Sequence, residues 1–221
     1  MLKIKELFDL SHTLAGEYLS SFTYHYEALS GIKNMIASLG ASLSDAEYDE
    51  IAPHVWVARS AVIAPTAYLG EYTVIGAETE VRHGAFVRGA ALIGAGCVVG
   101  NSTEIKNAII FDSVQIPHYN YVGDSILGYR SHMGAGSIAS NFRSDKGNIR
   151  VRCGDEILET GLRKLGTALG DYAEIGCGSV LSPGSVVGRR SIVYPLSHVR
   201  GTIPEGHILK DGGVLVARED R

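Results

Sequence analysis

Branched aliphatic residues recur at every sixth position through much of the chain. The first series consists of Ile51, Val57, Ile63, Leu69, Ile75, Val81, Val87, Ile93, Val99 and Ile105. A second series consists of Leu169, Ile175, Leu181, Val187, Val193 and Val199. The residue two places before each aliphatic is nearly always small, and glycine often follows it. Such regularity indicates one structural unit that is repeated along the chain.

The six-residue period excludes a helix and indicates short strands joined by tight corners. At ~3.6 residues per turn, six residues rotate a helix by about 600°, so they do not share a face. Short strands can point each aliphatic side chain inward, while glycine relieves the corners. The pattern resembles the hexapeptide repeat of left-handed parallel β-helices, in which three hexapeptides form one coil. We therefore predict a mainly β protein, a left-handed parallel β-helix of about seven coils.

Two segments fall outside the repeat. Residues 1–50 are predicted to form a small helical appendage that packs against the first coils and caps the open end of the β-helix. Its pattern predicts a helix that ends near Gly40, and S-D-A-E at 44–47 reads as a capping box before a short helix. Residues 51–221 form the predicted β-helix domain. A loop interrupts this domain at about 140–168, with a hairpin around Gly154.

The register shortens between residues 105 and 139. The aliphatic positions there are Ile105, Ile110, Ile116, Val122, Leu127, Met133 and Ala139, so two steps span five residues. One short step lies in 116–128, which reads I-P-H-Y-N-Y-V-G-D-S-I-L-G. A short step draws a corner inward and leaves a dent in the prism, where a ligand fits. We expect Ile116 and Val122 to point inward and to leave His118 free for chemistry.

Composition narrows the class of protein. Hydrophobic residues make up 45% of the 221 residues, enough for a large core, and the net charge of −4 argues against nucleic-acid binding. The three cysteines form no CxxC pair, which argues against a disulfide framework, and Cys97 is predicted to be a packed thiol. No apolar run approaches the ~20 residues that span a bilayer. We expect a cytoplasmic protein without a membrane partner.

Four motifs carry a more specific resemblance. They are E-I-K-N at 104–107, P-H-Y-N-Y-V-G-D at 117–124, M-G-A-G-S at 133–137 and S-N-F at 140–142. In order and spacing they resemble the acetyltransferase domain of the bifunctional glucosamine-1-phosphate acetyltransferase/N-acetylglucosamine-1-phosphate uridyltransferase. The matched core covers about residues 80–145. The resemblance implies a transferase that is related to UDP-N-acetylglucosamine biosynthesis and assembles as a homotrimer with sites between neighbouring subunits.

The resemblance also implies roles for catalytic and cofactor residues. His118 falls on the catalytic histidine, and Asn141 on the asparagine near the amine. Ala135 falls on a backbone contact to acetyl-CoA. Cys177 stands where the family has a serine that contacts acetyl-CoA, and Lys146 matches a family lysine with a shift of one. Such acyl transfer needs a base to deprotonate the amine and N–H donors for the oxyanion, which His118 and the M-G-A-G corner can provide.

The substrate positions carry the cations that a sugar phosphate needs. Arg88, Lys106 and Tyr121 fall on sugar-phosphate contacts, and paired cations bind such a dianion through charge-assisted hydrogen bonds. His132 replaces a family asparagine, and we expect it to contact the substrate. The implied activity is an acetyl-CoA-dependent N-acyltransferase acting on an amino-sugar phosphate such as glucosamine-1-phosphate. No G-x-G-T-R-M loop precedes the repeat, so we expect no uridyltransferase half.

Two other functions remain open on the sequence. The loop after Asn141 reads N-F-R-S-D where the family has N-Y-D-G, which favours a non-catalytic scaffold that binds a sugar phosphate or nucleotide sugar. A zinc hydratase similar to γ-type carbonic anhydrases is the second alternative. That family has two of its three histidines in H-x-x-x-x-H spacing, whereas His118 and His132 are fourteen residues apart. This spacing argues against a metal site.

Overall fold

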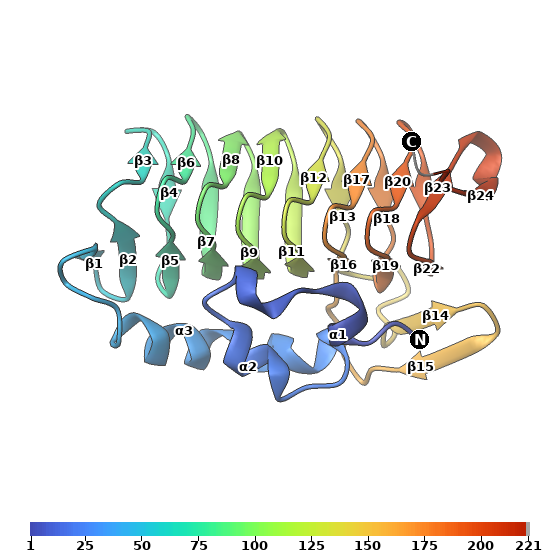
Figure 1. Cartoon of the computed structure of the whole chain (residues 1–221), viewed down its shortest axis with the longest axis horizontal. Coiled ribbons are helices and arrows are strands. Elements are labelled where there is room, and N and C mark those ends of the chain that lie inside the picture. Colours follow the sequence, from blue (N-terminus) through green and yellow to red (C-terminus); the bar gives the residue numbers. More distant parts are fainter. Residues whose placement is uncertain (220–221) are drawn as a thin grey trace.

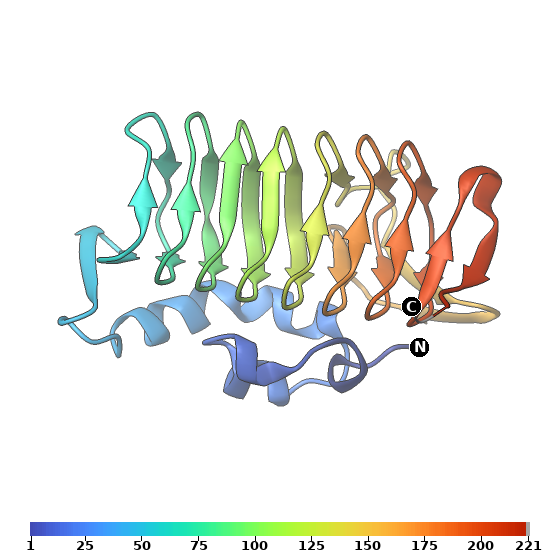
Figure 2. The same cartoon turned by 45° about the horizontal axis from the view of Figure 1, so that its top comes forward.

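The computed structural model describes residues 1–219 and confirms the left-handed parallel β-helix. Figures 1 and 2 show the strands stacked into one long prism. One ladder has nine strands, so the prism is longer than the about seven coils expected. This ladder runs through β3 (Val62–Ile63), β6 (Glu80–Val81), β8 (Val98–Asn101), β10 (Gln115–His118), β12 (His132–Met133), β17 (Glu174–Ile175), β20 (Ile192–Val193), β23 (His207–Leu209) and β24 (Leu215–Ala217).

A second ladder bends around one corner and supplies the other two faces. Its members are β1 (Tyr48–Ala52), β2 (Val55–Ala58), β4 (Tyr68–Leu69), β5 (Thr73–Ile75), β7 (Phe86–Ile93), β9 (Glu104–Ile110), β11 (Tyr121–Leu127), β13 (Ile138–Ala139), β16 (Thr167–Leu169), β18 (Val180–Leu181), β19 (Ser185–Val187), β21 (His198–Val199) and β22 (Thr202–Ile203). Pairing is parallel except between β1 and β2 in this ladder and between β23 and β24 in the first. The bend divides long strands such as β9 and β11 between two faces.

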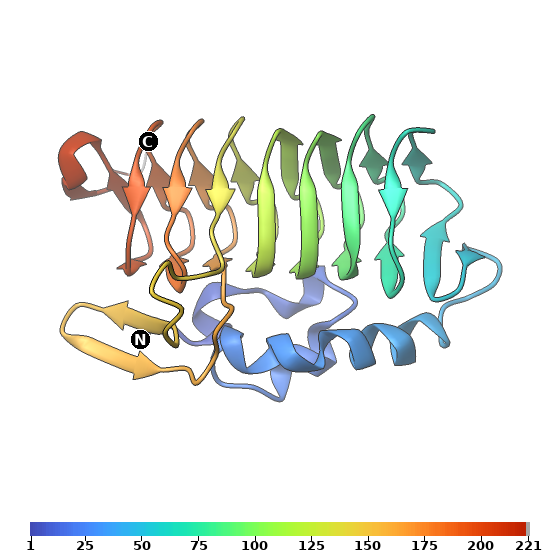
Figure 3. The same ribbon diagram turned by 180° about the vertical axis from the view of Figure 1, so that it is seen from behind.

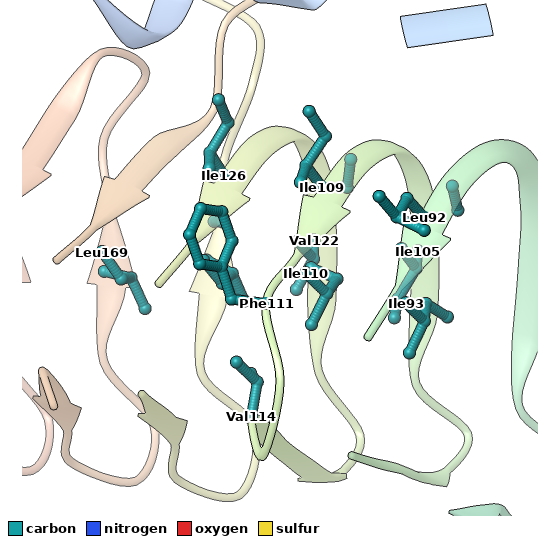
Figure 4. Close-up of a cluster of buried hydrophobic side chains, with 14 of the residues drawn as sticks. Leu92, Ile93, Ile105, Ile109, Ile110, Phe111, Val114, Val122, Ile126 and Leu169 are labelled. Atoms are coloured by element: carbon teal, nitrogen blue, oxygen red, sulfur yellow. The ribbon is translucent and has the colours of Figure 1, made fainter. Parts of the chain in front are cut away.

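The core consists of the periodic aliphatic residues. Those from Ile75 to Ile105 are fully buried, and Figure 4 shows several of them converging inside the coils. Ile51 is an exception at 57% exposed, because it lies in β1 before the first coil closes. Cys97 is 1% exposed, as predicted, and burial raises the pKa of its thiol to about 12. The small partner positions are also inward, and the Thr79 hydroxyl donates to the Gly94 carbonyl at 2.7 Å.

The corners adopt left-handed backbone conformations. One column of corners contains Ala90, Asn107 and Asp124, with φ of 49°, 46° and 50°. Both five-residue steps fall at this column, at Asn107 and Asp124. Non-glycine residues adopt this conformation at a cost, and Asn and Asp tolerate it best. At Gly100 close approach excludes any side chain, because an added Cβ would lie 1.5 Å from the Pro117 carbonyl oxygen.

The N-terminal helices lie along the side of the prism instead of capping its end (Figure 1). They are α1 (Ile4–Leu7), α2 (Gly16–Ser20) and α3 (Ile32–Gly40), with 3-10 turns at Leu10–His12 and His25–Gly31. They cover outward aliphatic residues of one face, namely Val74, Leu92, Ile109 and Ile126, all of which are fully buried. The helix that ends at Gly40 is confirmed, but the short helix expected after Ser44 is wrong. That segment makes one turn and enters β1, because β1 pairs with β2.

The segment that interrupts the repeat contains a hairpin of β14 (Arg150–Cys153) and β15 (Glu156–Glu159), turning at Gly154. Figure 3 shows it beside the C-terminal coils. Ile149 and Val151 are each 1% exposed, and the Thr202 hydroxyl donates to the Arg152 carbonyl at 2.6 Å. The hairpin is therefore anchored to the prism. Among residues 1–219, no helix combines the length and apolar character needed to cross a membrane.

Buried His25 makes stability dependent on pH. It is 2% exposed, neither ring nitrogen has a hydrogen-bond partner, and burial lowers its pKa from 6.5 to about 4. The unfolded chain therefore binds a proton more readily than the folded chain between these values. We expect His25 to add no pH dependence to the free energy of unfolding above pH 6.5, and to lower that free energy by about 3 kcal/mol as pH drops toward 4. Urea unfolding of His25→Leu should lack this component, and an unchanged pH profile would contradict it.

Candidate active site

His118, Ala135 and Cys177 lie at one corner of the prism in three successive coils. The Gly136 N–H donates to the His118 carbonyl at 2.9 Å, and the Gly178 N–H donates to the Ala135 carbonyl at 2.8 Å. All three side chains are exposed, whereas Ile116 and Val122 on either side of His118 are fully buried. The corner therefore presents an imidazole and two small residues in a row along the prism axis.

This corner also offers unused backbone donors. The N–H groups of Gly134 and Gly136 donate to Ile175 and His118. Within residues 1–219, the N–H groups of Ala135 and Cys177 have no backbone acceptor. Among the N–H groups of M-G-A-G, that of Ala135 is therefore the candidate oxyanion donor, because the N–H groups of both glycines already donate to backbone carbonyls. Backbone donors that are fixed in place suit the stabilisation of a developing oxyanion.

Asn120 holds the corner from the inside, although its sequence pattern suggested an outward side chain without a role. It is 3% exposed, and its Oδ1 accepts from the His118 N–H at 3.0 Å. Its Nδ2 donates to the Gly134 carbonyl at 2.8 Å and to the Ser137 hydroxyl at 3.0 Å. Asn120 therefore links the backbone of His118 to the turn that contains Ala135. Its place two residues before Val122 is the inward small position, which is the signal that identifies it.

A polar cluster occupies the next corner, six residues after His118. The Arg88 Nη1 lies 2.7 Å from Glu104 Oε1, and the Lys106 Nζ lies 3.1 Å from Asp124 Oδ2. The first pair is half exposed, but the Asp124 side chain is only 7% exposed. Asp124 also accepts from the Nδ2 groups of Asn107, at 2.8 Å, and Asn141. Three side-chain donors to one nearly buried carboxylate hold its position.

Glu104, Asn107 and Asp124 stand in the family-like motifs, yet no role is predicted for them from the sequence. Sequence spacing does not show that both five-residue steps share one corner, which is what brings Asn107 and Asp124 together. Their signal is that each motif contains a polar residue at a shortened step. The structure makes Asp124 the centre of the polar cluster.

The absence of a side chain at Gly123 leaves the space that the side chains of Tyr121 and Asn141 occupy. An added Cβ at Gly123 would lie 2.5 Å from the Tyr121 hydroxyl oxygen and 2.7 Å from Asn141 Nδ2. Burial, and then the nearby carboxylates of Glu104 and Asp124, raise the pKa of the Tyr121 hydroxyl. Tyr121 therefore stays a neutral donor at physiological pH. A surface groove of about 470 Å³ adjoins this cluster and includes Lys33 of α3.

The structure brings neither His132 nor Lys146 into these two clusters. His132 lies in β12, where it pairs with Gln115 of β10, three residues before the His118 corner, and its Nδ1 is 2.9 Å from Glu174 Oε2. Lys146 lies in the loop before the hairpin, with φ of 59°, and its N–H donates to the Arg143 carbonyl at 3.0 Å. Their roles stay predictions. Among residues 1–219, no three His, Cys, Asp or Glu side chains gather in a metal-binding arrangement.

Comparison with known proteins identifies relatives of the same segment. Residues 78–158 match the family model of the GMPPB C-terminal domain. The bifunctional sugar-1-phosphate nucleotidylyltransferase/acetyltransferase of Sulfurisphaera tokodaii is 30% identical over 105 residues, which are 48% of this chain and 26% of the relative. Bifunctional protein GlmU of Methanocaldococcus jannaschii is 37% identical over 83 residues, which are 38% of this chain and 20% of the relative. The matched segments thus cover about a quarter of these relatives or less.

Solved structures give weaker similarities. PerB from Caulobacter crescentus, in complex with CoA and GDP-perosamine, is 20% identical with a TM-score of 0.34. The alignment covers 80% of this chain and 62% of PerB. Similarity at this level supports no conclusion about the activity of this chain.

Proposed function

We propose that this chain, a left-handed β-helix that resembles the C-terminal part of bifunctional GlmU, is an acetyl-CoA-dependent N-acyltransferase. The proposed acceptor is an amino-sugar phosphate such as glucosamine-1-phosphate. The observation that carries the proposal is the row of His118, Ala135 and Cys177 at one corner, with two unused N–H groups beside an exposed imidazole. The names of the sequence relatives, which include an acetyltransferase activity, support the same reaction class.

The chemistry follows from these positions. His118 accepts a proton from the acceptor ammonium, and the neutral amine attacks the thioester carbonyl carbon of acetyl-CoA. The carbonyl oxygen becomes an oxyanion, and the Ala135 N–H donates to it. The C–S bond then breaks and coenzyme A leaves as the thiolate, which takes the proton held by His118, while the second proton of the amine nitrogen passes to solvent. The Cys177 N–H, one coil further along, is placed to hold a carbonyl of the pantetheine arm.

Arg88 and Lys106 of the polar cluster have different roles in the proposed binding of the sugar phosphate. Lys106 is locked to buried Asp124, so its charge is already neutralised. Arg88 pairs with Glu104 at a half-exposed site, where such pairs contribute little to stability. A phosphate dianion can therefore compete for Arg88 more readily than for Lys106. We assign Arg88 the direct phosphate contact, with Lys106, Asp124 and Asn141 fixing the surrounding geometry.

Arg88→Ala tests this assignment. We expect the KM for glucosamine-1-phosphate to rise at least tenfold with little change in kcat, because a charge-assisted hydrogen bond to the ground state is lost. Initial rates would be followed with acetyl-CoA and a thiol reagent that detects coenzyme A. The KM for acetyl-CoA should stay unchanged, and Arg59→Ala, which removes an exposed arginine paired with Asp49, serves as the matched control. An unchanged KM for the sugar phosphate would remove Arg88 from the site.

We also propose that the active site lies between subunits of a homotrimer. His118 and Asp124 of the polar cluster stand at opposite edges of one face, six residues apart, which is at most about 20 Å of extended chain. Along this face runs a column of outward side chains in register, of which Tyr68, Phe86, Ile138 and Val180 are at least 38% exposed. A neighbouring copy would cover this apolar column and bring the two clusters together. Light scattering that gave the mass of a monomer would contradict this assembly.

A second function is favoured by the surroundings of His118. Within residues 1–219, no side chain forms a hydrogen bond with its imidazole, whereas catalytic bases are commonly oriented by a third group. The alternative is a non-catalytic protein that binds a sugar phosphate or nucleotide sugar. Thermal unfolding with coenzyme A separates the two, since this alternative predicts no shift in Tm. The proposed transferase predicts a rise in Tm that grows with coenzyme A concentration.

A further inference from the structure

An arginine-rich groove lies between the hairpin and the C-terminal coils. It has a volume of about 500 Å³, and the guanidinium groups that line it belong to Arg143, Arg150, Arg152 and Arg200. Asp145 is the carboxylate among its lining residues, so the lining carries a net charge of +3. The whole chain carries −4. A concentration of positive charge against this background indicates a site for an anion.

The arginines differ in how far they are already neutralised. Arg143 forms an ion pair with Asp145, and the Nε of Arg150 lies 2.6 Å from Glu159 Oε1. Within the described residues 1–219, Arg152 and Arg200 form no ion pair with a carboxylate. Two guanidinium groups therefore remain available, and each presents several N–H donors to phosphate oxygens.

The two free arginines come from different parts of the fold. Arg152 lies in β14 of the hairpin, and Arg200 follows β21 of the prism. The hairpin is held in place where the Thr202 hydroxyl donates to the Arg152 carbonyl. The Ser182 hydroxyl, which also lines the groove, lies 2.7 Å from His198 Nε2. The groove is thus built by anchored elements and is not a chance approach of mobile surface side chains.

The groove is separate from the proposed sugar-phosphate contact. Arg200 occupies the position after an inward aliphatic, as Arg88 and Lys106 do in earlier coils. The pairing from β9 to β21 takes four steps, through β11, β13 and β18. At about 4.8 Å per step, Lys106 and Arg200 stand about 19 Å apart along the axis. One phosphate cannot reach both.

We propose that this groove is a second anion site, which binds a phosphate or diphosphate group of a ligand that extends along the same face. Two sources fit this chemistry. One is coenzyme A, which carries a 3′-phosphate and a diphosphate. The other is a diphosphate on the acceptor, as in a nucleotide sugar. The site stands on the charge and geometry of the groove, independently of the proposed acetyl transfer.

The test is calorimetric binding of pyrophosphate to the full chain at low ionic strength. Arg152→Ala/Arg200→Ala should weaken binding at least tenfold, since both unpaired guanidinium groups are lost. The control Arg59→Ala/Arg82→Ala removes two arginines elsewhere, one exposed and one half-buried, and the same net charge, and it should bind as the wild type does. Arg200→Glu, a single change at an exposed residue, should abolish binding if the double variant folds poorly.

The same variants then distinguish the sources of the phosphate. Weaker binding of coenzyme A, but not of dephospho-coenzyme A, assigns the groove to the 3′-phosphate, and equal weakening of both assigns it to the diphosphate. Weaker binding of UDP-glucosamine, with coenzyme A unaffected, assigns it to the acceptor. Equal pyrophosphate affinity in the wild type and the double variant would overturn the proposal. So would a loss confined to pyrophosphate, which would show an adventitious anion only.

Discussion

His118→Ala should lower kcat for acetyl transfer to glucosamine-1-phosphate by roughly 10²–10⁴-fold, the range found when a general base is removed. The KM for the sugar phosphate should change little, because Arg88 and the polar cluster lie at the other edge of the face. The imidazole is exposed, so its loss leaves no cavity. The fall in rate would therefore report chemistry and not folding. Rates would be measured by coenzyme A release over a range of acceptor concentrations.

His83 provides a matched control for this substitution. It is an exposed histidine at the same corner in an earlier coil, where its carbonyl accepts from the Asn101 side chain at 3.0 Å. Asn101 in turn pairs in register with His118. His83→Ala should leave both kcat and KM unchanged. A kcat for His118→Ala close to that of the wild type would remove His118 from the mechanism.

Phe111→Ala should lower the free energy of unfolding by about 3–5 kcal/mol, the typical cost of deleting a buried aromatic ring. Phe111 is fully buried, and its ring centroid lies 5.1 Å from that of Phe8. It therefore fills the junction between the N-terminal segment and the prism, as the close-up in Figure 4 shows for its prism side. Urea unfolding at a fixed protein concentration measures the change, since assembly makes stability depend on concentration.

Phe142→Ala is the control for this prediction. Phe142 is 43% exposed, so the same change in side chain should cost much less. Limited proteolysis adds a second readout, because loss of the Phe8 contact should expose the N-terminal helices to cleavage before the coils. Equal stability of Phe111→Ala and Phe142→Ala would contradict the view that the helices and the prism share one core.

The six-residue pattern predicts the fold because the coil geometry repeats itself in the sequence. Each inward slot from Ile75 to Ile105 demands the same kind of residue, so the period is visible without any structure. The position of the N-terminal helices is harder to predict from the sequence. The apolar face of 29–39 shows that these residues pack against something, but not against what. The signal lies in the coils, where doublets such as Leu92-Ile93 and Ile109-Ile110 place aliphatic residues on both sides of a strand.

Some residues of the candidate site can also be predicted from the sequence, and others cannot. His118 is predictable because its neighbours Ile116 and Val122 fix the direction of the strand between them. The roles of Asn120 and Asp124 are not predictable in this way. The Asn120 side chain turns inward, and Asp124 lies at a corner whose φ angle depends on the local step length. Charge pairing is also hidden from the sequence. The pairs Arg88–Glu104 and Lys106–Asp124 join residues 16 and 18 positions apart, which only the stacking of coils brings together.

A crystal structure of the full chain with coenzyme A would show whether the cofactor binds at the corner that carries His118. We expect the pantetheine arm to follow the corner of Ala135 and Cys177, with one of its carbonyls accepting from an N–H of this row. The thiol should lie beside the His118 imidazole, at the boundary with a neighbouring subunit. Coenzyme A bound on another face, or a His118 ring with neither cofactor nor subunit near it, would rule out this active site.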